Sequence, residues 1–361
     1  MPHLQQPFGQ AMERFLVPKP MIIAANKFRD CIRKFNYQPF DEKKFTGFWK
    51  TITVRYSEKT NDMMLMILSQ NSTIKEQIDK LKNQLKATGN NENNDQNILG
   101  KIETLQKNLV ELKKEEIDQI RQEMLEIPSI RSCIFDDTVL FGDRLWTEQI
   151  LGYTFEISPE SFFQVNRSQC EVLYNKIGEA ILNEDENENS NAKKKEKTKK
   201  KNILLDICCG TGTIGISLNK NFDQILGLEI VKEAIENAQR NAATNKITNI
   251  EYFLGSAEQT LPTAIKPYHD SEIYSVSAIL DPPRNGLHFS LINSIRVCQP
   301  IKKLVYVSCN IEANRTQQNF VDLTRAPSKR IMGEAFRLVS VTPVDMFPNT
   351  NHIENILVFE R

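Results

Sequence analysis

The segment with the clearest chemical potential is Ser308-Cys309-Asn310, which follows a short apolar run from Leu304 to Val307. That run is β-branched and aromatic, and it predicts a buried strand. A thiol at the carboxyl end of a parallel strand lies where open α/β sheets hold their ligands, and its thiolate could act as a nucleophile. A buried structural cysteine is the alternative, because free cysteines are among the residues most often found in protein cores.

Three acidic residues also stand at the ends of predicted strands: Asp206, Glu229 and Asp281. Two prolines follow Asp281, and they restrict the backbone at that strand end. Strands that alternate with helices predict a parallel, doubly wound α/β sheet whose carboxyl ends share one edge. We therefore expect the three carboxyl groups and Cys309 to lie at the same edge of the sheet.

The stretch Asp206-Ile-Cys-Cys-Gly210-Thr-Gly212-Thr213 predicts a strand, a glycine turn and the start of a helix. Glycines let a ligand approach the backbone, and the helix start offers unpaired N–H groups. Such a loop alone could bind a dinucleotide, so a nucleotide-dependent oxidoreductase is an alternative. S-adenosylmethionine is favoured because Asp206 could face its cationic methionine end and Glu229 could accept the ribose hydroxyls. For Glu229, a capping role at the strand end is the simpler alternative.

Near the C-terminus, two apolar runs, Val339–Val344 and Ile356–Phe359, predict paired strands. Between them lies His352-Ile-Glu354, and in an extended chain His352 and Glu354 share one side. A solvent-facing glutamate is the alternative, because that is where most glutamates lie.

The composition of the 361 residues is that of an ordinary globular protein, with 46 basic and 46 acidic side chains. Nucleic-acid binding therefore cannot be argued from bulk charge. No apolar run approaches the roughly 20 residues that cross a bilayer, so we expect no membrane association. The seven cysteines and four histidines show no metal-ligand spacing, and we predict no metal. Scattered thiols fit a reducing compartment, the cytoplasm or nucleus, with mitochondria as the alternative.

The chain is expected to fold as two domains. Residues 1–20 are proline-rich and predict a loose lead-in, and 21–150 predict a smaller α+β domain that includes a helical hairpin over 72–125. The larger domain covers 151–361, interrupted at 184–201 by a charged low-complexity stretch that we expect to be a disordered loop.

Within the smaller domain, Phe48–Tyr56 and Met63–Leu68 predict a β-hairpin. Its basic and aromatic side chains could form an RNA surface, but a solvated sheet face is the favoured interpretation. Two amphipathic helices follow, with apolar repeats at Ile74–Leu85 and from Ile98 toward Ile120.

Five motifs together resemble those of the RNA 5-methyluridine methyltransferases that use S-adenosylmethionine. The amino-acid sequence of the glycine loop is most similar to that of the eukaryotic tRNA branch. The motifs are Phe162-Phe-Gln164-Val-Asn166, the glycine loop, Asp281-Pro-Pro-Arg284, Val307-Ser-Cys-Asn310 and His352-Ile-Glu354. The resemblance implies a Rossmann-like methyltransferase fold with a mostly parallel seven-stranded sheet. It also implies methylation of uridine C5 in RNA, above all the T-loop uridine at tRNA position 54, through an adduct between a cysteine and C6.

The resemblance assigns roles to individual residues of this chain. Cys309 is the implied nucleophile and Glu354 the implied base that removes the C5 proton. The residues expected to hold S-adenosylmethionine are Gln164, Asp206, Gly210, Thr213, Glu229 and Asp281. The implied partner is RNA, most of all tRNA, and we expect a monomer.

Three alternatives remain open. An amino-group methyltransferase would carry an aromatic residue where this chain has Arg284. A non-catalytic RNA-binding or RNA-chaperone protein could retain the same fold. The third alternative is a ribosomal-RNA 5-methyluridine methyltransferase.

Overall fold

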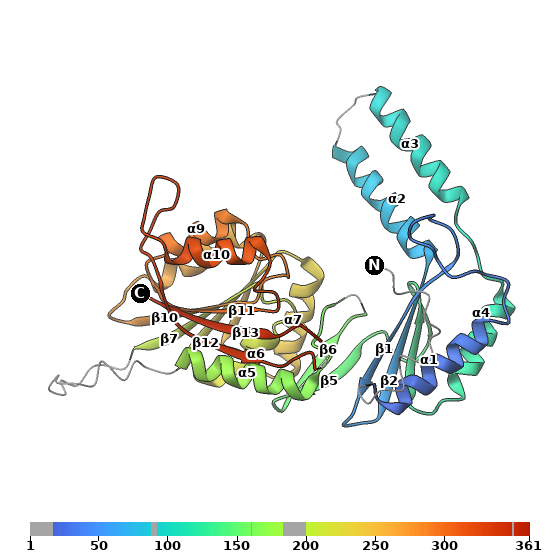
Figure 1. Cartoon of the computed structure of the whole chain (residues 1–361), viewed down its shortest axis with the longest axis horizontal. Coiled ribbons are helices and arrows are strands. Elements are labelled where there is room, and N and C mark those ends of the chain that lie inside the picture. The colour runs from blue at the N-terminus through green and yellow to red at the C-terminus, as the bar shows by residue number, and fades with distance from the viewer. Residues whose placement is uncertain (1–16, 88–91, 160, 183–199, 349) are drawn as a thin grey trace. The chain divides into compact units, whose positions relative to one another are not determined.

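A computed structural model describes residues 17–87, 92–159, 161–182, 200–348 and 350–361 of the chain. The chain divides into two units, Met1–Trp146 and Thr147–Arg361 (Figure 1). Nearly all of the expected lead-in 1–20 and charged loop 184–201 lies outside the described residues, although the first helix already begins at Lys19.

The first unit is built on a four-stranded sheet in the order β1-β2-β3-β4. Its strands are β1 (Trp49–Ser57), β2 (Asp62–Ser69), β3 (Ile130–Phe135) and β4 (Thr138–Phe141). The predicted hairpin is confirmed, because β1 and β2 pair antiparallel with Ser57 opposite Asp62. β2 and β3 pair in parallel, so the chain must cross over between them. Helices α1 (Lys19–Ile32) and α4 (Lys114–Leu125) pack together on one face of the sheet (Figure 1).

A helical hairpin lies within that crossover, formed by α2 (Gln70–Ala87) and α3 (Glu92–Lys107). Its two helices share a separate small core of four buried isoleucines: Ile74, Ile78, Ile98 and Ile102. The expectation that the second helix continues toward Ile120 is wrong. α3 ends at Lys107, and Ile120 belongs to α4, where it packs into the core of the sheet.

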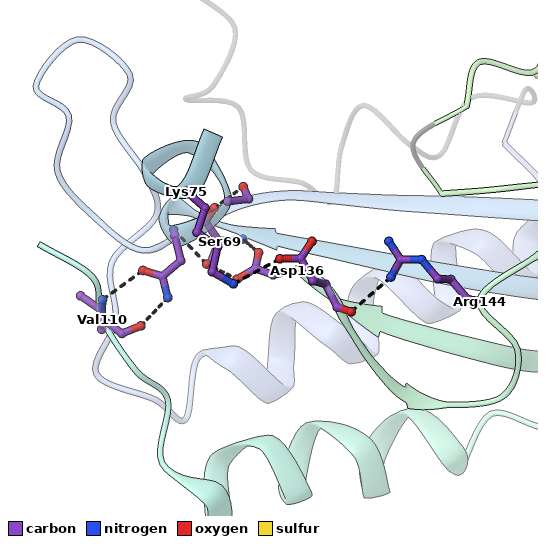
Figure 2. A network of polar contacts seen from close by, with 8 residues as sticks. Ser69, Lys75, Val110, Asp136 and Arg144 are labelled. Carbon is purple, nitrogen blue, oxygen red and sulfur yellow. Dashed lines mark hydrogen bonds and ion pairs between the residues drawn. The ribbon is translucent and has the colours of Figure 1, made fainter. Parts of the chain in front are cut away.

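A network of polar contacts at the base of the hairpin explains this break (Figure 2). The Asn71 side chain accepts a hydrogen bond from Val110 N at 3.0 Å and donates one to Val110 O at 2.5 Å, as a neighbouring strand would. Ser69, at the end of β2, donates from its N and its hydroxyl to the Asp136 carboxylate at 2.7 and 2.6 Å. The hydroxyl of Ser69 also accepts from Asn71 N at 3.1 Å. Both ends of the hairpin are therefore held at one place.

The second unit contains a seven-stranded sheet in the order β12-β13-β11-β10-β7-β8-β9. Its strands are β7 (Lys201–Ile207), β8 (Gln224–Glu229), β9 (Ile250–Leu254), β10 (Tyr274–Leu280), β11 (Ile301–Ser308), β12 (Arg337–Val344) and β13 (Glu354–Glu360). Its helices are α5 (Arg167–Leu182), α6 (Thr213–Leu218), α7 (Lys232–Thr244), α8 (Ala257–Ile265), α9 (Phe289–Val297) and α10 (Asn314–Thr324). In Figure 1, α9 and α10 lie on one face of the sheet and α5 on the other.

The strand order fixes where a ligand site can form. β7 pairs in parallel with β8 on one side and with β10 on the other, so the winding direction reverses between β7 and β10. The carboxyl ends of neighbouring strands diverge at such a switch point and leave a crevice. β13 and β12 complete the sheet antiparallel to their neighbours. The predicted fold class, a doubly wound and mostly parallel seven-stranded sheet, is confirmed.

A short two-stranded sheet precedes the large one, formed by β5 (Trp146–Ile150) and β6 (Tyr153–Ile157). Three asparagines spaced by four residues, two on α7 and one directly after it, hold β6 and the loop that follows it. Asn245 exchanges two hydrogen bonds with the Thr154 backbone, at 2.9 and 2.6 Å, and Asn237 donates to the Ser161 hydroxyl at 2.8 Å.

The middle asparagine of this row, Asn241, is fully buried. Its Oδ1 accepts from Glu156 N at 2.7 Å, and its Nδ2 donates to Thr211 O, in the glycine loop, at 3.1 Å. One amide therefore joins β6 to the glycine loop and satisfies one backbone N–H and one backbone carbonyl inside the fold.

We predict that Asn241→Ala lowers the free energy of unfolding by about 2 kcal/mol or more, because it leaves both backbone groups without a partner. Urea unfolding followed by circular dichroism measures the change. Gln239→Ala, on the exposed side of the same helix, is the matched control and is expected to be nearly neutral. Equal stability of the two variants would contradict this account of Asn241.

Candidate active site

Asp206 lies at the end of β7, beside the switch point, and is 1% exposed. Its Oδ2 accepts a hydrogen bond from Gly215 N at 3.0 Å, whereas its buried Oδ1 has no partner among the described residues. Burial raises the pKa of Asp206 to about 7; the Gly215 N–H opposes this shift, and the carboxylates of Asp281 and Glu229 add to it. A buried acceptor without a partner costs free energy. Oδ1 is therefore suited to a cationic or hydrogen-bond-donating ligand.

The glycine loop turns sharply before α6. Gly210 and Gly212 have φ angles of +54° and +78°, in the left-handed region that favours glycine. A side chain at Gly212 would lie 2.5 Å from the Tyr252 hydroxyl, so that position must remain a glycine. A side chain at Gly210 would meet nothing within 4 Å, so one surface of the loop stays open to an approaching ligand.

Glu229, at the end of β8, joins the glycine loop to the segment that follows β8. Its carboxylate accepts hydrogen bonds from Gly210 N at 3.0 Å, Ile230 N at 2.8 Å and Val231 N at 2.9 Å. The structure thus has the capping arrangement that the sequence offered as an alternative. The same contacts place the carboxylate directly beside the open surface of Gly210.

Two more predicted residues lie at the margins of this edge. Thr213 is the first residue of α6, and its hydroxyl shares a hydrogen bond of 2.8 Å with Tyr174 on α5. Gln164 is half-buried in the loop between β6 and α5. Asn166 ties this loop to the segment before β13 by donating to Met346 O at 3.3 Å.

Cys309 and Glu354 meet through the pairing of β11 with β13. These strands are antiparallel, and Ser308, the last residue of β11, is paired with Asn355 near the start of β13. Cys309 lies one residue past the end of β11, and Glu354 is the first residue of β13, so the last pair of the ladder brings both to the same end of the two strands. The charge of Glu354 acts on the thiol and raises its pKa. Segments far apart in the sequence thereby place a thiol and a carboxyl group side by side at the carboxyl edge of the parallel strands.

The electrostatic surroundings of the thiol are mixed. Cys309 is partly buried, and burial raises its pKa; Glu354 adds to the shift, while the positive charge of Arg284 opposes it. Glu354 is 3% exposed, and burial together with Asp281 raises its pKa to about 8. Burial likewise raises the pKa of Asp281 to about 7. Asp206, Asp281 and Glu354 are therefore largely protonated at lower pH and become charged near or above neutrality.

The structure decides between some of the sequence alternatives. Cys309 is not sealed in the core, and Glu354 is not a solvent-facing edge residue. His352, expected to share a side with Glu354, is exposed instead. The sequence analysis did not single out Tyr174, which is buried and bonded to Thr213. Its place on the apolar face of α5 was the available signal, because a buried tyrosine hydroxyl needs a hydrogen-bond partner.

Within the described residues, no group of three or more His, Cys, Asp or Glu side chains is placed to hold a metal ion. Nor does any helix in the described part of the chain have the length and apolar character to cross a membrane.

The second unit has the fold of the Rossmann-like methyltransferases. A solved structure with this fold is the Pyrococcus abyssi tRNA (uracil-54, C5)-methyltransferase in complex with S-adenosyl-L-homocysteine, with a TM-score of 0.56 at 20% sequence identity. The similarity covers 94% of this chain and 66% of that one. At such low identity it establishes the fold alone.

Sequence comparison defines the family. Residues 191–361 match the model of the tRNA (uracil-5-)-methyltransferase family. The tRNA (uracil-5-)-methyltransferase homolog A of Mus musculus is 34% identical over 354 residues, which are 96% of this chain and 50% of that protein. Homolog B of Pongo abelii is 40% identical over 226 residues, which are 62% of this chain and 43% of that protein. Residues 191–361 belong to the tRNA (uracil-5-)-methyltransferase family, and the chain spans about half the length of these curated relatives.

The raised pKa of Glu354 predicts a pH-dependent stability. A carboxyl group whose pKa is higher in the folded state than in the unfolded state lowers stability as pH rises between the two values, here from 4.5 to about 8. Glu354→Gln removes this effect. We expect the ligand-free variant to gain several degrees in Tm relative to wild type between pH 5 and pH 9, since each kcal/mol shifts Tm by about 2–4 °C in a domain of this size.

Glu312→Gln, at an exposed position of the same unit, is the control and should show no such trend. Thermal unfolding across the pH range measures both variants. A Tm difference between Glu354→Gln and wild type that stays constant from pH 5 to pH 9 would disprove the assignment.

Proposed function

We propose that this protein methylates C5 of uridine in RNA with S-adenosylmethionine as methyl donor, through a covalent bond between Cys309 and C6 of the base. The observation that carries the proposal is the adjacency of Cys309 and Glu354 on the paired ends of β11 and β13, at the edge where Asp206, Glu229 and Asp281 also open. Family membership supports the same reaction.

The residues at the switch point suit the proposed donor. The partnerless Oδ1 of Asp206 can accept from the ammonium of the methionine moiety. Glu229 lies beside the open surface of Gly210 and can exchange its backbone contacts for ribose hydroxyls. Thr213 follows the glycine loop and Asp281 follows β10 at the same edge, and we propose that Gln164 joins them in holding the donor. When bound, S-adenosylmethionine supplies the electrophilic methyl group.

The protein must supply a nucleophile and a base because uracil C5 is a poor nucleophile. The Cys309 thiolate forms a bond to C6, and the displaced electron pair makes C5 reactive toward the methyl group. Glu354 then accepts the proton that remains on C5. The electron pair of that C–H bond restores the C5–C6 double bond, and the thiolate leaves. The sequence of covalent steps replaces one difficult step by easier ones.

The electrostatics of the site suit these two roles. The thiolate is the reactive form of cysteine, and Arg284 favours it through its positive charge. A base works best when its pKa lies near the working pH, and the pKa of Glu354 is about 8.

The proposal extends to the substrate and the setting of the reaction. The target base has to leave its stack to reach a thiol at a sheet edge, so the substrate uridine is flipped out. The names of the relatives favour tRNA, and we propose the T-loop uridine as the target. We further propose that the protein acts as a monomer in the cytoplasm or nucleus. Release of tritium from C5-labelled uridine in tRNA tests the reaction, and it separates an active enzyme from a non-catalytic RNA-binding protein of the same fold.

We predict that Cys309→Ala lowers the rate of tritium release by about 10⁴-fold or more, the scale on which loss of a nucleophile is felt. Binding of S-adenosyl-L-homocysteine, measured by calorimetry, should stay close to wild type because the donor site lies at other strand ends. Cys298→Ala, a buried cysteine of the same unit, is the control and should retain activity. Turnover by Cys309→Ala at the wild-type rate would rule out the covalent route.

We predict that Glu354→Gln accumulates a covalent complex with RNA, because methylation can proceed while proton removal cannot. The complex should appear as a slowly migrating band on a denaturing gel and should disappear when Cys309 is also replaced. Glu312→Gln is expected to form no more of this complex than wild type. Product release by Glu354→Gln at the wild-type rate would exclude this residue as the base.

A further inference from the structure

A buried amide lies behind the candidate active site. Asn319 belongs to α10 and is 2% exposed. Its Oδ1 accepts hydrogen bonds from Leu287 N at 2.8 Å and from the Tyr306 hydroxyl at 3.1 Å, and its Nδ2 donates to Leu287 O at 2.9 Å. The side chain of Asn319 thus contacts two segments beside α10: the loop after β10 and the strand β11.

The contacts with Leu287 hold the loop from Asp281 to His288. Two hydrogen bonds to one backbone residue imitate the pairing of a neighbouring strand and fix the end of the loop. The preceding residue, Gly286, has a φ of +72°, and a side chain there would lie 2.8 Å from the Asn319 Oδ1. The loop therefore lies directly against α10 with no space between them.

The exit of the loop is fixed as well. His288 caps α9 by accepting from Ser290 N at 3.3 Å, and the Ser290 hydroxyl donates to Glu258 on α8 at 2.6 Å. β10 and β11 run side by side with Leu280 opposite Tyr306, so the loop that is held in this way begins next to the end of β11 that carries Cys309. Within this loop Arg284 is exposed, and its positive charge lowers the pKa of Cys309.

The contact with Tyr306 holds β11, the strand that leads to Cys309. Tyr306 is fully buried in β11, three residues before Cys309. Asn319 is therefore bonded both to the loop that carries Arg284 and to the strand that carries the thiol.

We propose that Asn319 is a positioning residue for Cys309: its amide sets the loop from Asp281 to His288 against β11 so that Arg284 reaches the thiol. The importance of this contact for catalysis rests on the proposed function. The effect of Asn319 on the thiol does not depend on the proposed function, because the reactivity of Cys309 can be measured without RNA or methyl donor.

A purely structural amide would have a different signature. It would change stability and leave the ionisation of Cys309 as it was. The charged groups that face the thiol are Arg284, Glu354 and Asp281. Of these, only Arg284 favours the thiolate, so loss of its position would raise the pH at which Cys309 reacts.

The experiment measures alkylation of Cys309 by iodoacetamide in the ligand-free protein from pH 7 to pH 10, with each cysteine followed by peptide mass spectrometry. The variants are Asn319→Ala, Arg284→Ala and the double variant. Gln317→Ala, on the exposed side of α10, is the matched control. We expect both single variants to react about tenfold more slowly than wild type at pH 8, which corresponds to a thiol pKa higher by about one unit.

The double variant decides whether Asn319 acts through Arg284. If it does, adding Asn319→Ala to Arg284→Ala slows alkylation no further, since coupled residues are non-additive. A folded Asn319→Ala protein with the wild-type pH profile, or a double variant in which the two effects multiply, would overturn the proposal.

Should Asn319→Ala fail to fold, Tyr306→Phe removes one of the three hydrogen bonds of the amide and retains the ring. Its rate is expected to fall between those of wild type and Arg284→Ala, and a wild-type rate would overturn the proposal. A protein without methyltransferase activity whose alkylation rates follow the expected pattern would refute the proposed function and leave the role of Asn319 intact.

Discussion

The candidate active site depends on the antiparallel pairing of β13 with β11. Parallel strands place their carboxyl ends on one edge of a sheet, and there the chain collects Asp206, Glu229, Asp281 and Cys309. A strand running the other way presents its amino end at that edge. Glu354 can therefore lie beside Cys309 only because β13 reverses direction, and a parallel β13 would carry its first residue to the opposite edge.

The same edge concentrates carboxyl groups in a region of low solvent exposure. Burial raises the pKa of Asp206 and Asp281 to about 7 and that of Glu354 to about 8. Such groups lower the stability of the folded state as pH rises from their ordinary pKa values, 3.8 for aspartate and 4.5 for glutamate, to these raised values, as active-site residues often do. A cationic ligand would reverse this effect. The arrangement is thus poor for the stability of the ligand-free protein and well suited to the binding of a sulfonium compound.

Sequence patterns predicted the parts of the fold that depend on local periodicity. The strands that end at Asp206, Glu229 and Asp281 follow from apolar runs and glycine or proline punctuation, and these also placed the candidate residues on one edge. The break between α3 and α4 and the role of Asn319 were not predicted. Both depend on a side-chain amide that replaces a backbone partner far away in the sequence, and no periodicity within a single segment records such a pairing.

The anchoring of the helical hairpin at its base has an evolutionary consequence. Asn71 and Val110 are bonded to each other, and Ser69 joins this point to Asp136 in the sheet, so the two ends of the hairpin stay together whatever its length. Closing a longer loop costs little extra entropy, and helices α2 and α3 have a small core of their own. Insertions or deletions of paired helical turns can therefore accumulate in this arm across a lineage without disturbing the sheet from which it extends.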